Sequence, residues 1–247
     1  MRIDILTLFP EMFIQTLGTS IIGRAQVGNL VEFHFWNIRD FAKDKHRVVD
    51  DTPYGGGAGM LLKPDVVVDS IEYVKRFNQG PVIYFTPQGQ TFNQQQAKIL
   101  STEQELILLC GHYEGLDERV RENWVDLELS IGDYVLTGGE LPAMVVIDAV
   151  VRLLPGVLGD DQSAKNDSFY DGLLEHPHYT RPANFRGLSV PDVLLSGHHE
   201  QIRRWRLKES LRRTYYRRPD LIKTRSLTDE EKLLLAEIVN ECSDERG

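Results

Sequence analysis

Short apolar runs alternate with segments of helical spacing along the chain as far as Pro155. Apolar runs that end in loop residues are typical of buried strands, and five of them span residues 3–9, 31–36, 82–85, 106–110 and 125–131. Helix signals mark residues 64–77, where Pro64 can open the first turn, 93–100, where Asn93 can cap it, and 139–154. This alternation predicts an α/β fold whose sheet is mainly parallel.

The pattern changes beyond Pro155. From 156 to 171 the chain is rich in Gly, Asp, Gln, Ser, Lys and Asn and poor in apolar residues, which predicts a mobile linker. Helical spacing then returns, most clearly over 198–216 and 228–242. We therefore expect an α/β domain over 1–159, an interdomain linker over 160–172 and a small helical domain over 173–247.

Composition places the chain among globular proteins, with 41% hydrophobic and 26% charged residues in 247. No apolar run approaches the roughly 20 residues that a membrane-spanning helix needs, and the first residues lack the apolar core of a signal peptide. The two cysteines, Cys110 and Cys242, offer no thiolate metal cluster and fit a reducing compartment. We expect a cytoplasmic protein without a disulfide or a membrane partner.

The net charge of −9 disfavours a nucleic-acid partner unless positive charge is concentrated locally. It is concentrated: residues 200–225 contain ten basic and three acidic residues, a net +7, which leaves −16 elsewhere. Trp205, Tyr215 and Tyr216 lie among these arginines, and guanidinium groups with planar rings suit phosphates and bases. The segment predicts RNA binding, and the alternative is a solvated helix face balanced by acidic residues elsewhere.

Three of the predicted strands run into glycine-containing loops, at residues 84–89, 110–115 and 130–139. If the strands are parallel neighbours, these loops meet at one edge of the sheet, where open α/β folds bind ligands. The loops together predict a small-molecule pocket, although any one of them alone is better explained as a strand-ending turn.

Other kinds of site have less support. Neither G-x-G-x-x-G nor G-x-x-x-x-G-K-[ST] occurs, which disfavours a cofactor anchored by phosphate. Residues 55–59 have the composition of a flexible lid or an anion nest, without a helix that binds phosphate. The paired histidines, His176 with His178 and His198 with His199, lack the spacing of a catalytic zinc helix, and no G-x-S-x-G turn indicates a hydrolase.

Taken in order, the motifs resemble those of the bacterial tRNA (guanine-N1)-methyltransferases, the TrmD type of the SPOUT class. The resemblance covers almost the whole chain and rests on Ile5-Leu6-Thr7-Leu8-Phe9-Pro10, Asp50-Asp51-Thr52-Pro53-Tyr54-Gly55-Gly56-Gly57-Ala58-Gly59-Met60, Cys110-Gly111-His112-Tyr113-Glu114-Gly115, Ser130-Ile131-Gly132-Asp133-Tyr134 and Glu175-His176-Pro177-His178-Tyr179-Thr180-Arg181-Pro182. One departure is Phe85-Thr86, where the family has Leu-Ser before Pro87; both exchanges keep the residue class.

The resemblance implies a fold that periodicity does not reveal. In this family the α/β domain is threaded as a trefoil knot, which is a rare exception to ordinary topology, and a linker and a small helical domain follow. The family also forms an obligate homodimer with two active sites at the interface, each built from both chains.

The resemblance further implies S-adenosylmethionine as methyl donor, bound in the knot by main-chain hydrogen bonds and apolar contacts. The implied cofactor-binding residues belong to the three glycine loops: Tyr84, Pro87, Gly111, Tyr113, Glu114, Gly115, Ser130, Ile131, Gly132, Asp133, Tyr134, Val135, Leu136, Gly138 and Gly139. Mg²⁺ is also implied, but no ligand pattern in the sequence identifies its site.

For the chemistry, the family's substrate is the guanosine immediately 3′ of the anticodon, tRNA position 37. By resemblance, Asp167 removes the N1 proton, and Arg152 stabilises the negative charge that develops on O6. Taken alone, these two residues would be read as a solvated loop aspartate and an ordinary helix-terminal charge. The anticodon arm is expected to contact residues of the glycine loop and of the helical domain: Gly57, Gly59, His178, Arg203, Arg206, Arg212 and Arg213.

Two alternatives remain beside the guanine-N1 methyltransferase. One is a knotted methyltransferase that acts on a ribose 2′-hydroxyl or on another RNA, and the other is an RNA-binding module without catalysis. A ribose methylase has no need of a base and an O6 partner at Asp167 and Arg152. A pure RNA binder would not bind S-adenosylmethionine.

Overall fold

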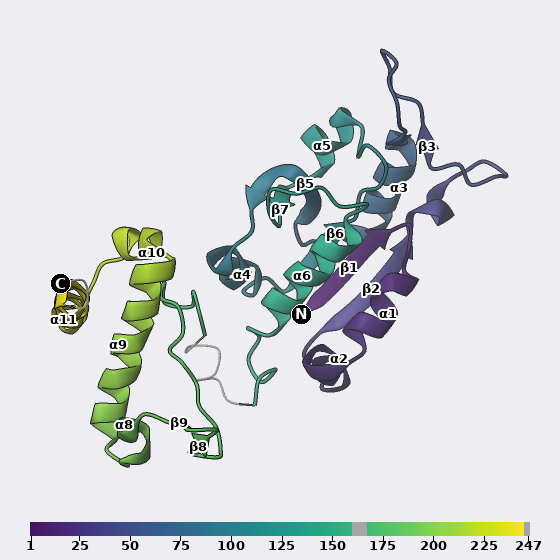
Figure 1. The fold of residues 1–247 in the computed structure, drawn as a ribbon. Helices are drawn as coiled ribbons and strands as arrows, with labels where there is room; N and C mark the ends of the chain where they lie inside the picture. The colour runs from purple at the N-terminus through teal and green to yellow at the C-terminus, as the bar shows by residue number, and fades with distance from the viewer. Residues whose placement is uncertain (160–166, 245–247) are drawn as a thin grey trace. The chain divides into compact units, whose positions relative to one another are not determined.

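The computed structural model describes residues 1–159 and 167–244 (Figure 1). The chain divides into two compact units, Met1–Asp161 and Gln162–Gly247. Most of the predicted linker, residues 160–166, lies outside the described residues, so its predicted mobility stays a prediction.

The first unit is built on a five-stranded sheet with the order β2-β1-β6-β5-β7, in which every neighbouring pair is parallel. The strands are β1 (Arg2–Thr7), β2 (Glu32–Asn37), β5 (Val82–Thr91), β6 (Glu105–Leu109) and β7 (Leu127–Ser130). Each of the five apolar runs overlaps one of these strands. The predicted α/β class and the mainly parallel sheet are confirmed.

Helices cover both faces of this sheet (Figure 1). One face packs against α1 (Glu11–Leu17), α2 (Ser20–Val27), α4 (Gln94–Leu100) and α6 (Glu140–Val151). The other packs against α3 (Pro64–Val74) and α5 (Glu118–Trp124). Alternate residues of a strand therefore enter different cores: in β6, Leu106 and Leu108 pack on the α6 side, and Ile107 and Leu109 pack on the α3 side.

Local signals in the sequence account for several helix ends. Asn93 forms a capping box with Gln96 at the start of α4, and Pro64 occupies the first turn of α3. The short 3₁₀ helix η1 (Ile38–Phe41) follows β2, and its first turn is capped by the Asn37 side chain. A two-stranded antiparallel pair, β3 (Asp50–Asp51) with β4 (Leu61–Leu62), holds the ends of the 55–59 glycine loop together.

The second unit is mainly helical. It contains the short antiparallel pair β8 (Asn184–Phe185) and β9 (Leu188–Ser189), followed by α8 (Asp192–Leu195), α9 (His199–Arg217), α10 (Pro219–Thr224) and α11 (Asp229–Asp244). Leu173, Leu211, Leu234 and Ile238 form its buried core. In the described ranges, no helix has the length and apolar character needed to cross a membrane.

Candidate functional site

The three glycine-containing loops line one cavity of about 280 Å³ in the first unit. It lies where β6 and β7 end and beside residues 84–88, which the sequence predicted as a loop but which lie inside β5, where its pairing with β7 is irregular. The carboxyl ends of parallel strands form the edge at which such sheets place their ligands. Its lining residues are Tyr84, Phe85, Thr86, Pro87, Gln88, Gly111, His112, Tyr113, Glu114, Gly115, Leu129, Ser130, Ile131, Gly132, Tyr134, Val135, Leu136, Thr137, Gly138, Gly139 and Pro142. We refer to this cavity as the donor pocket.

The donor pocket brings together nearly all of the predicted cofactor-binding residues. Asp133 is the exception, because its exposed side chain is not part of the lining. The pocket is also lined by residues that the sequence motifs did not indicate: Phe85, Thr86, Gln88, His112, Leu129, Thr137 and Pro142. Most of them lie inside the same loops, so loop membership was the signal that could have found them.

Main-chain hydrogen bonds hold the walls of the donor pocket to one another. The Gly139 amide donates to the Gly111 carbonyl at 2.9 Å, which joins the loop after β6 to the start of α6. Gly139 must be glycine for this approach, because a Cβ there would lie 2.8 Å from the Cα of Cys110. A neighbouring segment supports the wall, since the amide of Glu114 donates to the carbonyl of Met60 at 2.9 Å.

A buried carboxylate lies behind the same wall. Glu140, in the first turn of α6, is 2% exposed and accepts a hydrogen bond of 2.8 Å from the hydroxyl of Thr7 at the end of β1. Its other oxygen lies 3.5 Å from Nε2 of His112, a residue of the pocket lining. Burial, and then the charge of Glu140, raise the pKa of the Cys110 thiol well above its ordinary value. Cys110 is therefore an inert structural thiol.

The lining indicates which ligand the donor pocket suits. Within the described residues no lysine or arginine lines it, so it lacks the cations that would hold a phosphate. Backbone groups of glycine loops, apolar side chains and a few polar groups are typical of a pocket for a nucleoside-like molecule. Burial raises the pKa of Tyr84 further above neutrality, and its phenol can donate a hydrogen bond.

The glycine loop between β3 and β4 reaches the rim of the donor pocket. Gly55, Gly56, Gly57 and Gly59 have positive φ angles of 79–122°. The predicted RNA contact Gly59 lies against Glu114 of the lining, since a Cβ at Gly59 would be 2.4 Å from its side chain. Gly57 is exposed and open to solvent.

The two predicted catalytic residues belong to different units. Arg152 is the C-cap residue of α6 in the first unit. Asp167 is half-buried in the second unit and lines a cavity of about 510 Å³ there. That cavity is completed by Asp171, Leu173, Leu174, Glu175, His176, His199, Ile202, Arg203, Arg206, Leu207 and Ser210. We refer to it as the Asp167 cavity.

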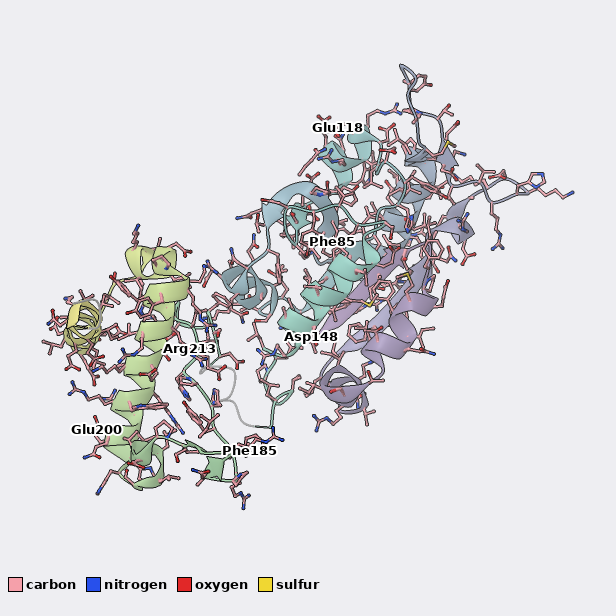
Figure 2. All side chains as sticks on the ribbon, viewed as in Figure 1. Phe85, Glu118, Asp148, Phe185, Glu200 and Arg213 are labelled. Atoms are coloured by element: carbon pink, nitrogen blue, oxygen red, sulfur yellow. The ribbon has the colours of Figure 1, made fainter. Side chains whose placement is uncertain are left out.

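The predicted RNA-binding arginines of α9 fall into two groups. Arg203 pairs with Glu200 and Glu230, and Arg212 pairs with Glu209 and Glu241. Figure 2 shows Glu200 near the start of α9 and Arg213 farther along it. The acidic side chains of α11 thus neutralise one face of α9. This agrees with the alternative interpretation of residues 200–225, a solvated helix face balanced by acidic residues elsewhere.

The other two predicted RNA-binding arginines of α9, Arg206 and Arg213, make different contacts. Arg213 donates to the Glu175 carbonyl at 3.4 Å, and Arg206 lines the Asp167 cavity. His178, another predicted RNA contact, is exposed, and its Nε2 lies 2.6 Å from a Glu175 carboxylate oxygen.

The fold and the site thus define the class: a parallel α/β domain with a glycine-walled pocket whose described lining residues include no lysine or arginine. Residues 1–224 match the family described as tRNA (Guanine-1)-methyltransferase TrmD, and the chain belongs to this family. The family resemblance inferred from the sequence motifs is thereby confirmed, and with it the SPOUT class and methyltransferase activity.

Curated relatives match over nearly their full lengths. The chain is 61% identical over 241 residues to a tRNA (guanine-N(1)-)-methyltransferase of Brevibacillus brevis, covering 98% of this chain and 99% of the relative. Relatives of the same name in Desulforamulus reducens and Anoxybacillus flavithermus are 57% and 59% identical. These two alignments cover 97% and 94% of this chain, and 96% of each relative.

Proposed function

We propose that the protein transfers the methyl group of S-adenosylmethionine to N1 of the guanosine immediately 3′ of the anticodon in tRNA. The observation that carries this proposal is the donor pocket, because three segments that match the family's motifs line a single cavity with no lysine or arginine among its described lining residues. S-adenosylmethionine fits such a cavity, since it carries an adenosine and an amino acid but no phosphate. When bound, it supplies a methyl group on a positively charged sulfur.

The proposed donor site uses the glycine-loop residues for shape and main-chain polarity. Gly111, Gly115 and Gly139 leave backbone groups accessible, and Tyr84 offers a protonated hydroxyl. The buried Glu140 carboxylate adds negative charge behind the wall, which favours a cationic ligand. Asp133 keeps its predicted role as part of the same loop, although its side chain lies outside the lining.

The proposed chemistry assigns one task to each catalytic residue. N1 of neutral guanine carries a proton, so a base must remove it as N1 attacks the methyl carbon. Asp167 is that base, and its place in the wall of a cavity supports the role. Negative charge then develops on O6, and the guanidinium of Arg152 stabilises it. The target guanine must leave the stack of neighbouring bases to react, and this costs the least free energy in a single-stranded loop.

Mg²⁺ has less support than the donor. In the parts of the chain that the structure covers, no three His, Cys, Asp or Glu side chains gather as a metal site. We therefore assign no step of the reaction to a metal ion.

The proposed assembly is an obligate homodimer of cytoplasmic chains, with the donor pocket inside a trefoil knot. Exposed apolar side chains beside the pocket support a partner chain: Val135 is 85% exposed, and Leu141 and Val145 on α6 are 49% and 48% exposed. Apolar side chains in such positions are typical of an interface. In this assembly each active site would combine parts of both chains.

The test is transfer of labelled methyl from S-adenosylmethionine to tRNA transcripts that differ only at the base after the anticodon. We expect label only in transcripts with guanosine there, and we expect Asp167→Asn to lower kcat by about 100-fold or more because the base is lost. Asp192→Asn is the matched control, since Asp192 is an exposed aspartate of α8 in the same unit. Equal loss in both variants, or label in every transcript, would contradict the proposal.

A further inference from the structure

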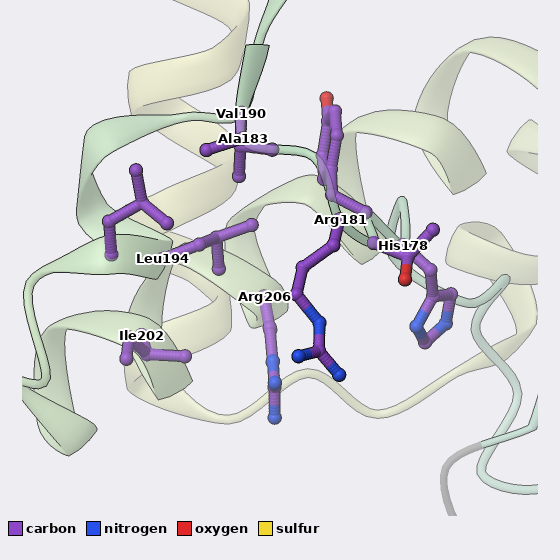
Figure 3. A pocket seen from close by; sticks show the side chains of 10 residues that line it. His178, Arg181, Ala183, Val190, Leu194, Ile202 and Arg206 are labelled. Carbon is purple, nitrogen blue, oxygen red and sulfur yellow. The ribbon is translucent and has the colours of Figure 1, made fainter. Parts of the chain in front are cut away.

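The second unit contains another cavity, of about 380 Å³, between residues 178–190 and helices α8 and α9. Its lining residues are His178, Tyr179, Thr180, Arg181, Ala183, Val190, Leu194, Leu195, Ile202 and Arg206. Figure 3 shows the side chains of Arg181 and Arg206 in this cavity, together with that of His178. The two arginines come from different segments, one from the loop before β8 and the other from α9.

The charge in this cavity is of one sign. None of its described lining residues is acidic, and the described residues form no ion pair with Arg181 or Arg206. The neighbouring cations of α9 differ, since Arg204 pairs with Glu237 at 2.5 Å and Lys208 pairs with Glu237 and Glu241. Among the described residues, ion pairs thus neutralise Arg203, Arg204, Lys208 and Arg212 of α9. No such pair involves Arg181 or Arg206, although carboxylates line the Asp167 cavity that Arg206 shares.

Two guanidinium groups in one cavity repel each other, and an anion bound between them removes that repulsion. Phosphate is the anion that suits them best, because a guanidinium can give it two parallel hydrogen bonds. The cavity also has an apolar side formed by Val190, Leu194 and Ile202, which strengthens attraction between opposite charges by excluding water.

We propose that Arg181 and Arg206 form a binding site for a phosphodiester of the RNA backbone. This inference rests on the proposed function and identifies which cations of the second unit bind the tRNA. Arg206 lines both this cavity and the Asp167 cavity. A phosphate held by Arg206 therefore positions the adjoining nucleotides beside the carboxylate that acts as base.

A neighbouring aromatic residue gives the site a second type of contact. Tyr179 is 50% exposed at the rim, and its ring centroid lies 6.4 Å from that of Trp205. An exposed ring beside a phosphate site can stack on a base of the bound strand. The site is accordingly suited to RNA rather than to an isolated phosphate ion.

The test compares Arg181→Gln and Arg206→Gln with Arg204→Gln, whose side chain lies on the same helix as Arg206 but is ion-paired with α11. For each full-length variant, the Kd for tRNA is measured as a function of salt, and the Kd for S-adenosylmethionine is measured by calorimetry. We expect each of the first two changes to raise the tRNA Kd about tenfold or more and to reduce the salt slope by about 1. Arg204→Gln should shift the tRNA Kd by less than about twofold.

The outcomes separate this inference from the proposed function. A wild-type tRNA Kd and salt slope in both Arg181→Gln and Arg206→Gln would overturn the phosphate site while leaving the methyltransferase intact. Failure of the unmodified chain to bind S-adenosylmethionine would count against the proposed function instead. Two further probes, inorganic phosphate and vesicles of anionic phospholipid, test the identity of the ligand. Binding of inorganic phosphate as tight as that of tRNA would contradict an RNA site. So would a result in which the two arginines affect binding of the vesicles but not of tRNA.

Discussion

Glu140 shows how one buried side chain can order a pocket it does not line. Its carboxylate connects Thr7 at the end of β1 with His112 in the loop after β6, and the residue itself begins α6. A buried carboxylate that loses a hydrogen-bond donor keeps its desolvation cost without compensation. The hydrogen bond between Thr7 and Glu140 therefore contributes both to the stability of the fold and to the geometry of the donor pocket.

We expect Thr7→Val to lower the free energy of unfolding by about 1–3 kcal/mol, because it removes the hydroxyl that Glu140 accepts from and leaves shape nearly unchanged. Urea unfolding measures the change. Thr16→Val is the control, since the hydroxyl of Thr16 donates to Met12 on an exposed helix surface, and it should cost less than about 0.5 kcal/mol. Equal values for the two variants would contradict this role for Glu140.

Gly139 tests the donor pocket at the same scale. Gly139→Ala places a Cβ 2.8 Å from the Cα of Cys110 and 2.9 Å from the amide nitrogen of Gly111, so the loop must shift. Overpacking of this kind costs about 1–3 kcal/mol, and we expect the Kd for S-adenosylmethionine to rise about tenfold or more. Calorimetry checks it, with Gly159→Ala as control because a Cβ there contacts nothing within 4 Å. Unchanged donor affinity in Gly139→Ala would remove this loop from the binding site.

Residue-level prediction from the sequence worked where the signal was local. The glycine-containing segments predicted the donor pocket because each follows an apolar run in the sequence. The Thr7–Glu140 contact joins residues 133 apart in sequence, and no local pattern specifies it. No local pattern specifies the ion pairs between α9 and α11 either, because Glu230, Glu237 and Glu241 lie 27–33 residues from their partners. These ion pairs decide which arginines of α9 are neutralised.

At the scale of elements, α9 and α11 are held together by ion pairs as well as by an apolar seam. Glu241 accepts hydrogen bonds from Lys208 and Arg212, which lower its pKa, and a hydrogen bond from Lys208 is the largest cause of the lowered pKa of Glu237. A carboxylate whose pKa is lower in the folded chain stabilises the fold above its unfolded pKa, and that stabilisation is lost as the pH falls through the folded value.

We therefore expect the contact between α9 and α11 to weaken on acidification below about pH 4.3, the ordinary pKa of a glutamate. Hydrogen exchange of α11 peptides, corrected for the intrinsic rate, should show protection falling from about pH 5 to about pH 3. Glu241→Gln should flatten this dependence, whereas Glu122→Gln on the exposed surface of α5 should leave it unchanged. A pH profile that is the same in both variants would contradict the role of these ion pairs.

Elements with a clear periodic pattern or a cap signal could be predicted from the sequence, and short elements without either could not. The five strand runs and the helices α3, α4, α6, α9 and α11 have clear periodicity or caps. Helices α1, α2, α5 and α10 span six to eight residues, too few for a periodic pattern to stand out. Strand β5 runs on to Thr91 because Gln90 and Thr91 pair with β7 after an irregularity, and strand order itself depends on long-range pairing.

At the scale of the whole molecule, the proposed second copy of the chain would cover the exposed apolar side chains of α6. Leu141 and Val145 lie one helical turn apart on this helix and are about half exposed. We expect the chain to sediment at twice its mass of 28.3 kDa, and we expect Val145→Asp to shift it toward the monomer and to lower methyl transfer in parallel.

Val27→Asp is the control for this experiment, because Val27 is 87% exposed at the end of α2. It should leave both sedimentation and activity unchanged. A monomeric chain with full activity would show that each active site is complete within one copy and would contradict the proposed assembly.

The central claim is the identity of the atom that receives the methyl group. The most direct measurement is mass spectrometry of the nucleosides and fragments of a tRNA transcript after incubation with the protein and S-adenosylmethionine. We expect 1-methylguanosine at the position that follows the anticodon, and its loss in Asp167→Asn. A 2′-O-methylated nucleoside, a methyl group at another position, or no modified nucleoside would contradict it.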